Sequence, residues 1–211
     1  MGSADEFDIT IVGKGGHAAI PNQTVDPIFI ASQVIVALQG AVSRVSDPVK
    51  PSVLSVTQFN SGSAYNVIPD TATLAGTIRT LDEETREKMN DTLYKVTNNI
   101  VESFGGTCKI EIEKGYPVTV NTKEETEFAA KVAAGLLGNE NVVRDIEPTM
   151  GAEDFSYMLQ EKPGCYVWLG QGITDSDYMV HHPLYDFNDE ILPIGTSFFV
   201  RLAEESLKCE D

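Results

Sequence analysis

The chain is poor in the residues that most often build disulfide and metal sites. Its 211 residues include three histidines and three cysteines, and Cys108, Cys165 and Cys209 form no C-x-x-C pair. An odd number of widely spaced cysteines argues against a disulfide framework and favours reduced thiols in a cytoplasmic protein. The sequence also lacks an H-E-x-x-H zinc motif.

Basic residues are scarce as well. The 15 Lys and Arg residues stand against 32 Asp and Glu residues, which gives a formal net charge of −17. This balance excludes the clustered basic footprint of a nucleic-acid-binding protein, and an acidic surface by itself identifies no partner. We find no apolar run that predicts a membrane span, and the opening residues MGSADEF lack the basic and apolar regions of a signal peptide. We therefore expect neither nucleic acid nor membrane as a partner.

The first half of the chain alternates strand patterns with two helical patterns. Polar and apolar residues alternate in four segments, at residues 7–12, 52–59, 71–80 and 108–116. Asp26, followed by Pro27, is an N-cap signal for the first helix, and a T-x-x-E capping box at Thr80 predicts the start of the second. The order strand, helix, strand, strand, helix, strand predicts a ferredoxin-like (βαββαβ) α+β domain over residues 5–118.

The second half, residues 119–211, has a different pattern. A capping box at Thr122 and Glu125 predicts a helix that ends at Gly138, and Glu153 and Asp154 are expected in the first turn of a short helix. The remaining predicted elements are a short strand at 141–146, a strand buried on both faces at 164–172 and a final helix at about 192–207. This order favours the C-terminal part of an α/β domain.

The stretch GKGGHAAIP, residues 13–21, raises the question of a phosphate-binding loop. Such a loop needs its lysine after the glycines and a Ser or Thr beside that lysine, whereas Lys14 precedes Gly15 and His17 stands at the end of the glycine run. Nucleotide binding is therefore the weakest of the functions considered. His17 lies in a loop too rich in glycine and alanine to need a histidine for packing, so its role is left open.

The other two histidines, His181 and His182, directly precede a proline. Proline forces an extended backbone at the residue before it, and neighbouring residues on an extended chain point to opposite sides. The pair can therefore supply one ligand to a metal site. A zinc site needs three or four ligands, so this chain offers at most one clear ligand of such a site.

Six phrases occur here in one order, and together they carry a resemblance: GKGGHAAIP, DP opening a helix, NVIPD, GTIRT, GAEDF and HHPLYDFND. They resemble the aminoacylase/carboxypeptidase family of dinuclear zinc amidohydrolases, which includes hippurate, N-acetyl-amino-acid and auxin-conjugate hydrolases. The resemblance covers nearly the whole chain. It implies a lid, or dimerisation, domain inserted between two segments of a catalytic α/β domain. Residues from about Asn121 onward would be the second catalytic segment, and the first segment has no counterpart here.

The resemblance also implies roles for single residues. His17, presented by flexible glycines, would polarise the scissile amide carbonyl, often in the neighbouring subunit, and His181 would be a zinc ligand. Asn66 and Arg79 would hold the substrate carboxylate, for which the planar guanidinium is well suited. The loop with Gly151 and Glu153 would line the site. From the residues alone, Arg79 is equally well an exposed strand residue and Asn66 a turn residue.

Two functional hypotheses follow. The first is part of a zinc-dependent amidohydrolase that hydrolyses N-acyl amino acids or small peptide-like amides. Two divalent metal ions, zinc by resemblance, and a metal-bound hydroxide would act in the intact enzyme, and this chain alone would lack a complete active site. The alternative is a non-catalytic association module, in which an edge strand and the helix from Asp26 pair two copies. A homodimer through the lid is compatible with both hypotheses.

Overall fold

The computed structural model describes residues 1–172 and 178–208, and these divide into two compact units. The first unit comprises residues 1–119 together with 148–158, and the second comprises 120–147 together with the residues from 159 onward. Each unit is described by itself below. Of the three cysteines, Cys108 and Cys165 are free thiols, and Cys209 lies outside the described residues.

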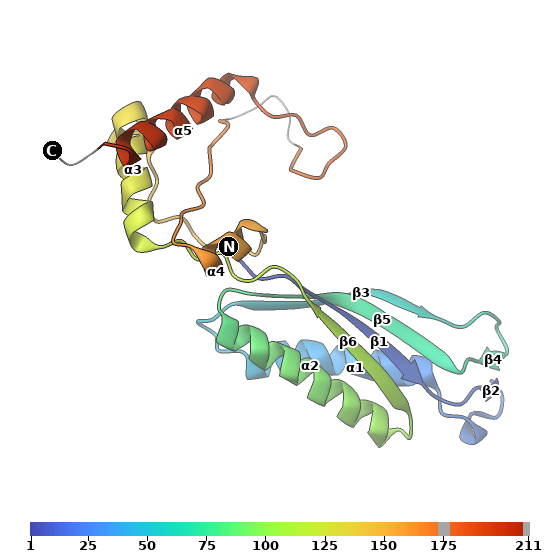
Figure 1. The fold of residues 1–211 in the computed structure, drawn as a ribbon. Helices are drawn as coiled ribbons and strands as arrows, with labels where there is room; N and C mark the ends of the chain where they lie inside the picture. The colour runs from blue at the N-terminus through green and yellow to red at the C-terminus, as the bar shows by residue number, and fades with distance from the viewer. Residues whose placement is uncertain (173–177, 209–211) are drawn as a thin grey trace. The chain divides into compact units, whose positions relative to one another are not determined.

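The first unit contains a four-stranded antiparallel sheet with the strand order β3-β5-β1-β6. The strands are β1 (Asp5–Val12), β3 (Ser52–Ser61), β5 (Thr71–Thr80) and β6 (Thr107–Lys114). Two helices, α1 (Pro27–Val45) and α2 (Glu83–Ser103), cover the same face of this sheet (Figure 1). The mixed α/β architecture predicted from the alternating patterns is therefore confirmed, with an antiparallel sheet and helices packed on it.

The core of the first unit lies between the sheet and these helices. In β1 the inward positions Phe7, Ile9 and Ile11 are fully buried, while Glu6 and Asp8 on the other face are exposed. This period of two places one row of side chains against the helices and leaves the opposite face of the sheet open. The helices complete the core with Ile30, Val34, Leu38, Met89, Leu93 and Val101.

Helix α1 does not agree with the expectation that the chain has no apolar run long enough to span a membrane. An 18-residue window within its 19 residues has a mean hydropathy of 1.6, so by length and composition alone the helix is long enough and apolar enough to cross a membrane. In the structure, however, Ile30, Val34 and Leu38 are buried against the sheet. Its place in the core accounts for these residues, whereas Ile28, Phe29 and Val36 of the same helix are 39%, 48% and 70% exposed.

The caps of the two helices differ in how well the sequence predicts them. Asp26 caps α1 as predicted, and its carboxylate accepts the backbone N–H of Ile28 at 2.9 Å. The capping box predicted at Thr80 is wrong, because Asp82 caps α2 and accepts the N–H of Thr85 at 2.9 Å. Thr80 is the buried last residue of β5, where it pairs with Ser52, and the observed cap Asp82 lies two residues later.

Gly76 gives a testable consequence of the close packing in this sheet. A Cβ at this position of β5 would lie 2.0 Å from the carbonyl oxygen of Ser55 and 2.5 Å from the ring of Phe7. We expect Gly76→Ala to destabilise the chain by roughly 1–3 kcal/mol, the usual cost of overpacking. Urea denaturation measures it. The control is Gly40→Ala in α1, where nothing lies within 4 Å of the added methyl group and a neutral or stabilising effect is expected. Equal effects of the two substitutions would contradict this account.

The second unit contains two long helices, α3 (Lys123–Leu137) and α5 (Leu192–Ser206), which contact each other. Short 3-10 turns lie at Asn139–Asn141 and Asp189–Ile191. Thr122 is the N-cap of α3 as predicted, but its hydroxyl bonds the Glu125 carboxylate and caps no helix N–H. The short helix α4 (Phe155–Glu161) starts in the part of the chain assigned to the first unit. It begins after Glu153 and Asp154, so these acidic residues precede the helix and do not form its first turn.

Neither strand predicted in the second unit is present. Residues 142–146 and 164–172 have no strand pairing among the described residues, and Trp168 is 52% exposed. A buried strand needs hydrogen-bonding backbone along its edges. Here the N–H of Thr122 donates to the carbonyl oxygen of Gly164 at 3.0 Å, and a side chain supplies further contacts. Asn121 uses its amide to pair with both the N–H and the C=O of Tyr166, each at 2.9 Å. The apolar residues that suggested a strand therefore remain partly exposed.

Candidate functional site

His17 and Asn66 lie together at one end of the first unit. The two-residue strands β2 (Gly16–His17) and β4 (Val67–Ile68) pair there, with His17 opposite Val67 (Figure 1). The N–H of Ala18 donates to the carbonyl oxygen of Asn66 at 3.0 Å, which extends this pairing by one step. The structure thus brings together two residues that are 49 positions apart in the sequence. We call this region, residues 13–21 and 64–70, the tip.

The glycines of the tip allow close packing and do not serve flexibility. A Cβ on Gly13 would lie 2.1 Å from the carbonyl oxygen of Val25, and one on Gly15 would lie 2.5 Å from that of Ile68. Side chains at either position would push apart the segments on which the loop rests. The expectation that flexible glycines present His17 is therefore corrected, since the loop is held by close contacts on both sides.

The imidazole of His17 is exposed, and one of its nitrogens has a fixed role. The N–H of Ala19 donates to His17 Nδ1 at 3.1 Å. A neutral imidazole carries one proton, so when Nδ1 is an acceptor the proton is on Nε2. In this arrangement His17 presents an N–H donor at Nε2, which is the group needed to stabilise a developing oxyanion.

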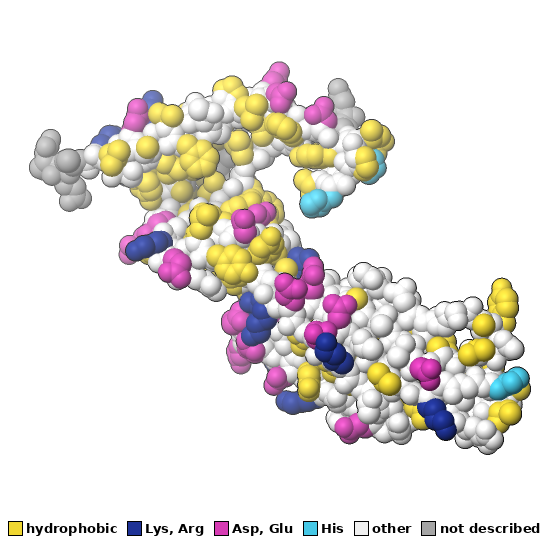
Figure 2. Space-filling view, turned by 45° about the vertical axis from the view of Figure 1, so that its right-hand side comes forward, with side chains coloured by type: hydrophobic (Ala, Val, Ile, Leu, Met, Phe, Trp, Pro, Cys, Tyr) yellow, Lys and Arg dark blue, Asp and Glu magenta, His cyan; other side chains and the backbone are white. Residues whose placement is uncertain are grey.

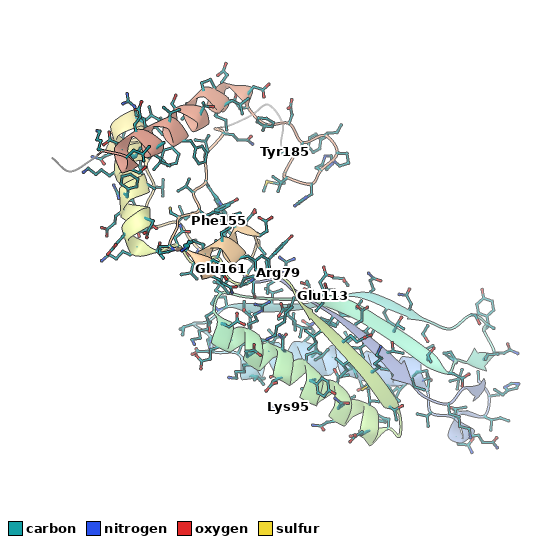
Figure 3. All side chains as sticks on the ribbon, in the orientation of Figure 1. Arg79, Lys95, Glu113, Phe155, Glu161 and Tyr185 are labelled. Carbon is teal, nitrogen blue, oxygen red and sulfur yellow. The ribbon has the colours of Figure 1, made fainter. Side chains whose placement is uncertain are left out.

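Arg79 lies in β5, toward the opposite end of the first unit from the tip (Figure 3). Its Nε donates to the hydroxyl of Thr77 at 3.2 Å, and its Nη1 donates to the carbonyl oxygen of Met150 at 3.5 Å. These contacts hold the half-buried guanidinium beside the loop that follows Pro148. Arg79 is therefore placed by side-chain contacts and is not a freely exposed strand residue.

Gly151 and Glu153 belong to the loop that contacts Arg79. The N–H of Gly2 donates to the carbonyl oxygens of Thr149 and Gly151, at 2.9 Å each. The Glu153 carbonyl oxygen accepts the hydroxyl of Ser156 at 2.6 Å. The loop is therefore fixed to the first unit, and Arg79, Gly151 and Glu153 form a second group of predicted site residues, which we call the base.

The tip and the base are separated by the length of β5. This strand runs from Thr71, next to the tip, to Thr80, next to the base. The eight residue steps from Thr71 to Arg79 span about 26 Å at roughly 3.3 Å per residue. His17 and Arg79 of one chain therefore cannot contact the same small amide. The predicted pairing of Asn66 and Arg79 on one carboxylate is likewise not formed within a single chain.

His181, the predicted metal ligand, lies in the second unit with a left-handed backbone conformation, φ 72°. Its neighbour His182 accepts the N–H of Leu184 at Nδ1 over 3.1 Å and stacks on Tyr178. Within residues 1–172 and 178–208, no three His, Cys, Asp or Glu side chains come close enough together to hold a metal ion. The described residues therefore do not form a complete set of metal ligands by themselves.

A buried ion pair at the base was missed by the sequence analysis. Asp5 is 0% exposed and Arg86 is 4% exposed, and Arg86 Nε contacts both Asp5 carboxylate oxygens at 3.0 and 3.1 Å. Asn90 and the N–H of Gly115 donate to the same carboxylate. The available signal was the alternation itself, because Asp5 continues the inward row of Phe7, Ile9 and Ile11.

The charge of Asp5 is stabilised by these partners. Burial alone would raise the pKa of Asp5, but the hydrogen bonds from Arg86 and Asn90 and the positive charge of Arg86 outweigh it and hold the pKa below its usual value. Hydrogen bonding to Asp5 likewise raises the pKa of Arg86 above its ordinary value. The pair joins the first residue of β1 to α2 and to the end of β6.

Comparison with known proteins identifies the protein family to which this chain belongs. Residues 3–205 match the model of Peptidase family M20/M25/M40, so the chain belongs to that family. It is 38% identical to the hippurate hydrolase of Campylobacter jejuni subsp. jejuni over 99% of this chain and 54% of that protein. It is 36% identical to the N-acetylcysteine deacetylase of Bacillus subtilis over 96% of this chain and 52% of that protein.

Solved structures show the same fold. A crystal structure of a Bacillus subtilis protein, described as a dinuclear metal binding peptidase from the M20 family, is 30% identical with a TM-score of 0.77. It is matched over 98% of this chain and 51% of that protein. A structure from methicillin-resistant Staphylococcus aureus has a TM-score of 0.85 at 27% identity. The chain thus spans about half the length of the relatives that it matches.

Proposed function

We propose that this chain is the lid and the second catalytic segment of an amidohydrolase that cleaves N-acyl amino acids or small peptide-like amides. Residues 5–118 of the first unit are the lid, and their strand order β3-β5-β1-β6 with two helices on one face supports a ferredoxin-like assignment. The relatives named as hippurate hydrolase and N-acetylcysteine deacetylase support the substrate class. A cytoplasmic location stays a prediction from the scarce, unpaired cysteines.

The observation that carries the proposal is the fixed hydrogen bonding of His17. With Nδ1 accepting from Ala19, the exposed imidazole offers Nε2–H to the oxygen of the amide carbonyl as negative charge develops there. Arg79 at the base binds the carboxylate of the amino-acid substrate through its planar guanidinium. Gly151 and Glu153 line the substrate site beside Arg79, and Asn66 at the tip is proposed as a second group that binds the substrate carboxylate.

The distance between tip and base supports a site shared by two copies. Because one chain cannot bring His17 and Arg79 to one substrate, the tip of one copy serves the base of another. Strand β3 is an edge of the sheet, and its residues Val53 and Phe59 are 38% and 41% exposed, which fits pairing of two lids. A homodimer through the lid then places two equivalent sites in one assembly.

Mixing two inactive variants tests the shared site. In the full-length protein that carries this chain, His17→Ala and Arg79→Ala are each expected to lose most activity. A mixed dimer has one site with both residues intact, so an equimolar mixture should regain about a quarter of the normal activity by random pairing. No recovery, with subunit exchange verified by mass, would contradict the shared site.

Arg79 itself should act on substrate binding. Arg79→Ala removes a charged partner of the substrate carboxylate, and we expect kcat/KM to fall by roughly 30-fold or more, mainly through KM, in line with ~2 kcal/mol or more for such a pair. Arg79→Lys keeps the charge and loses the bidentate geometry, so it should recover only part of the loss. A substrate amide without a free carboxylate is the control, and Arg79→Ala should affect it little.

Divalent metal ions belong to the proposed enzyme as a whole. They would polarise the amide and supply the nucleophile when bound, and His181 is proposed as one ligand. Since no complete ligand set lies in the described part of this chain, we expect fewer than two tightly bound zinc ions per chain by elemental analysis after zinc titration and dialysis. Two retained ions per chain would contradict this prediction.

The alternative function is a non-catalytic association module. The observation in its favour is the position of β3 at the edge of the sheet, where it would pair two copies whether or not a substrate is bound. The two functions differ in a simple way. A dimer whose full-length form hydrolyses no N-acyl amino acid in the presence of zinc would support the association module and overturn the enzyme.

A further inference from the structure

A residue outside the predicted site fixes the conformation of the tip. Asp70 follows β4 and makes two hydrogen bonds to the loop that carries His17. Its carboxylate Oδ1 accepts the N–H of Gly15 at 2.8 Å, and its backbone carbonyl accepts the N–H of Gly13 at 2.8 Å. One residue therefore binds the loop at two alternate N–H groups just before the histidine.

The hydrogen bonds of Asp70 hold the same loop as the β2–β4 pairing that contains His17. Gly16 and His17 pair with Ile68 and Val67, the residues that lead into the Pro69-Asp70 turn. Because Asp70 joins the far end of this turn to Gly15, the loop is closed against β4 on both sides of the β2–β4 pairing. A shift of the Gly15 backbone would move His17 along with it, since only one residue lies between them.

The position of the His17 ring relative to the N–H of Ala19 determines which ring nitrogen carries the proton. The contact from the N–H of Ala19 to Nδ1 is 3.1 Å and depends on the turn at residues 17–19. This turn is anchored on one side by the carbonyl of Asn66, which accepts the N–H of Ala18. On the other side it is anchored through Gly15 by Asp70. A charge-assisted bond such as that from Gly15 to the carboxylate is stronger than a neutral one.

We propose that Asp70 is the positioning residue of His17, holding the loop so that Ala19 occupies Nδ1 and the imidazole proton stays on Nε2. The proposal deepens the oxyanion role of His17 and rests on that proposed function only for its catalytic consequence. Asp70 itself touches no substrate in this account. Asp70 affects catalysis only by holding the loop, and the loop in turn keeps the proton of His17 on Nε2.

The tautomer of His17 is read directly by NMR on the 15N-labelled chain, which has only three histidines. At a pH where the imidazoles are neutral, the His17 nitrogens are expected to have two well separated shifts, with the proton on Nε2. In Asp70→Ala the two shifts should move toward each other, as both tautomers become populated. Asp70→Asn keeps an oxygen acceptor for Gly15 and should restore most of the separation.

Two further variants make the result specific. Gly15→Ala disturbs the same hydrogen bond at its donor, because the added Cβ would lie 2.5 Å from the carbonyl oxygen of Ile68. It should therefore reproduce the effect of Asp70→Ala. The matched control is Asp47→Ala, which removes a similar carboxylate contact to the N–H of Val49 in the loop between α1 and β3. It should leave His17 unchanged. Unaltered His17 shifts in folded Asp70→Ala would overturn the proposal.

Kinetics separates this proposal from the proposed function. In the full-length protein, Asp70→Ala should lower kcat with KM nearly unchanged, by less than the roughly 10²–10³-fold loss for an oxyanion donor removed outright. Asp70→Asn should recover it. If His17→Ala leaves kcat unchanged while Asp70→Ala still alters the tautomer, the result contradicts the oxyanion role of His17 and supports the positioning role of Asp70.

Discussion

Replacing His17 with alanine in the full-length protein should lower kcat by about 10²–10³-fold while KM changes little. In its proposed role, the Nε2–H of His17 would donate to an oxygen whose charge appears only in the transition state, so the ground-state complex would lose almost nothing. Steady-state kinetics with an N-acyl amino acid measures both constants. A rise in KM at unchanged kcat would show that His17 binds the substrate and does not stabilise the transition state.

Two substitutions control this result. Lys14→Ala lies in the same loop, and the exposed Lys14 side chain should contribute little because the Lys14 backbone makes the contacts to Val25. His182→Ala removes the histidine that neither the resemblance nor the geometry assigns to the site. Both variants should keep kcat within a few-fold of the normal value. A loss in either of them comparable to that of His17→Ala would contradict the specific role of His17.

Breaking the buried ion pair at the base should have the largest effect on stability. Arg86→Met leaves the Asp5 carboxylate buried without its cationic partner, and such losses cost about 3–5 kcal/mol. Urea denaturation at pH 7 measures the difference in the free energy of unfolding. The control is Lys95→Ala on the exposed surface of α2 (Figure 3), where the pair with Asp91 is 73% exposed on both sides and should be worth less than about 0.5 kcal/mol.

This contribution should also depend on pH in a defined direction. The pKa of Asp5 is lower in the folded chain than in the unfolded one. Its stabilisation is therefore fully present above the ordinary Asp pKa of about 3.9 and is lost as the pH falls through the lower folded value. Arg86→Met removes the cause of the lowered pKa, so the variant and the unmodified chain should approach each other in stability below about pH 3.9. A difference that stayed constant down to pH 2 would contradict this assignment.

The sequence predicted the first unit well because its signals are local. Alternation along β1 and the Asp26-Pro27 helix start depend on residues within one element, and the structure contains both. The start of α2 was misplaced because pairing of Thr80 with Ser52, a long-range contact, decides where β5 ends. Asp5 was missed for the same reason, since its partners Arg86 and Gly115 are far away in the sequence.

The second unit shows where local signals fail. Residues 164–172 have the composition of a buried strand, but a strand forms only when neighbouring backbone groups are available to it. Trp168, Val167 and Leu169 are 52%, 45% and 42% exposed, and hydrophobic side chains gather on the surface of the part that contains α5 (Figure 2). The motifs found His17, Asn66 and Arg79 as candidates, whereas only the structure shows that they lie at opposite ends of the first unit.

The length of β5 has a consequence for how activity varies with protein concentration. If the tip of one copy completes the base of another, the catalytic unit exists only in the dimer, and about 26 Å of strand prevents a monomer from substituting its own tip. Specific activity should then decline on dilution through the dimer dissociation constant and return on concentration. The concentration of the protein would then set the fraction of dimer and, through it, the turnover per molecule, without any additional regulatory ligand.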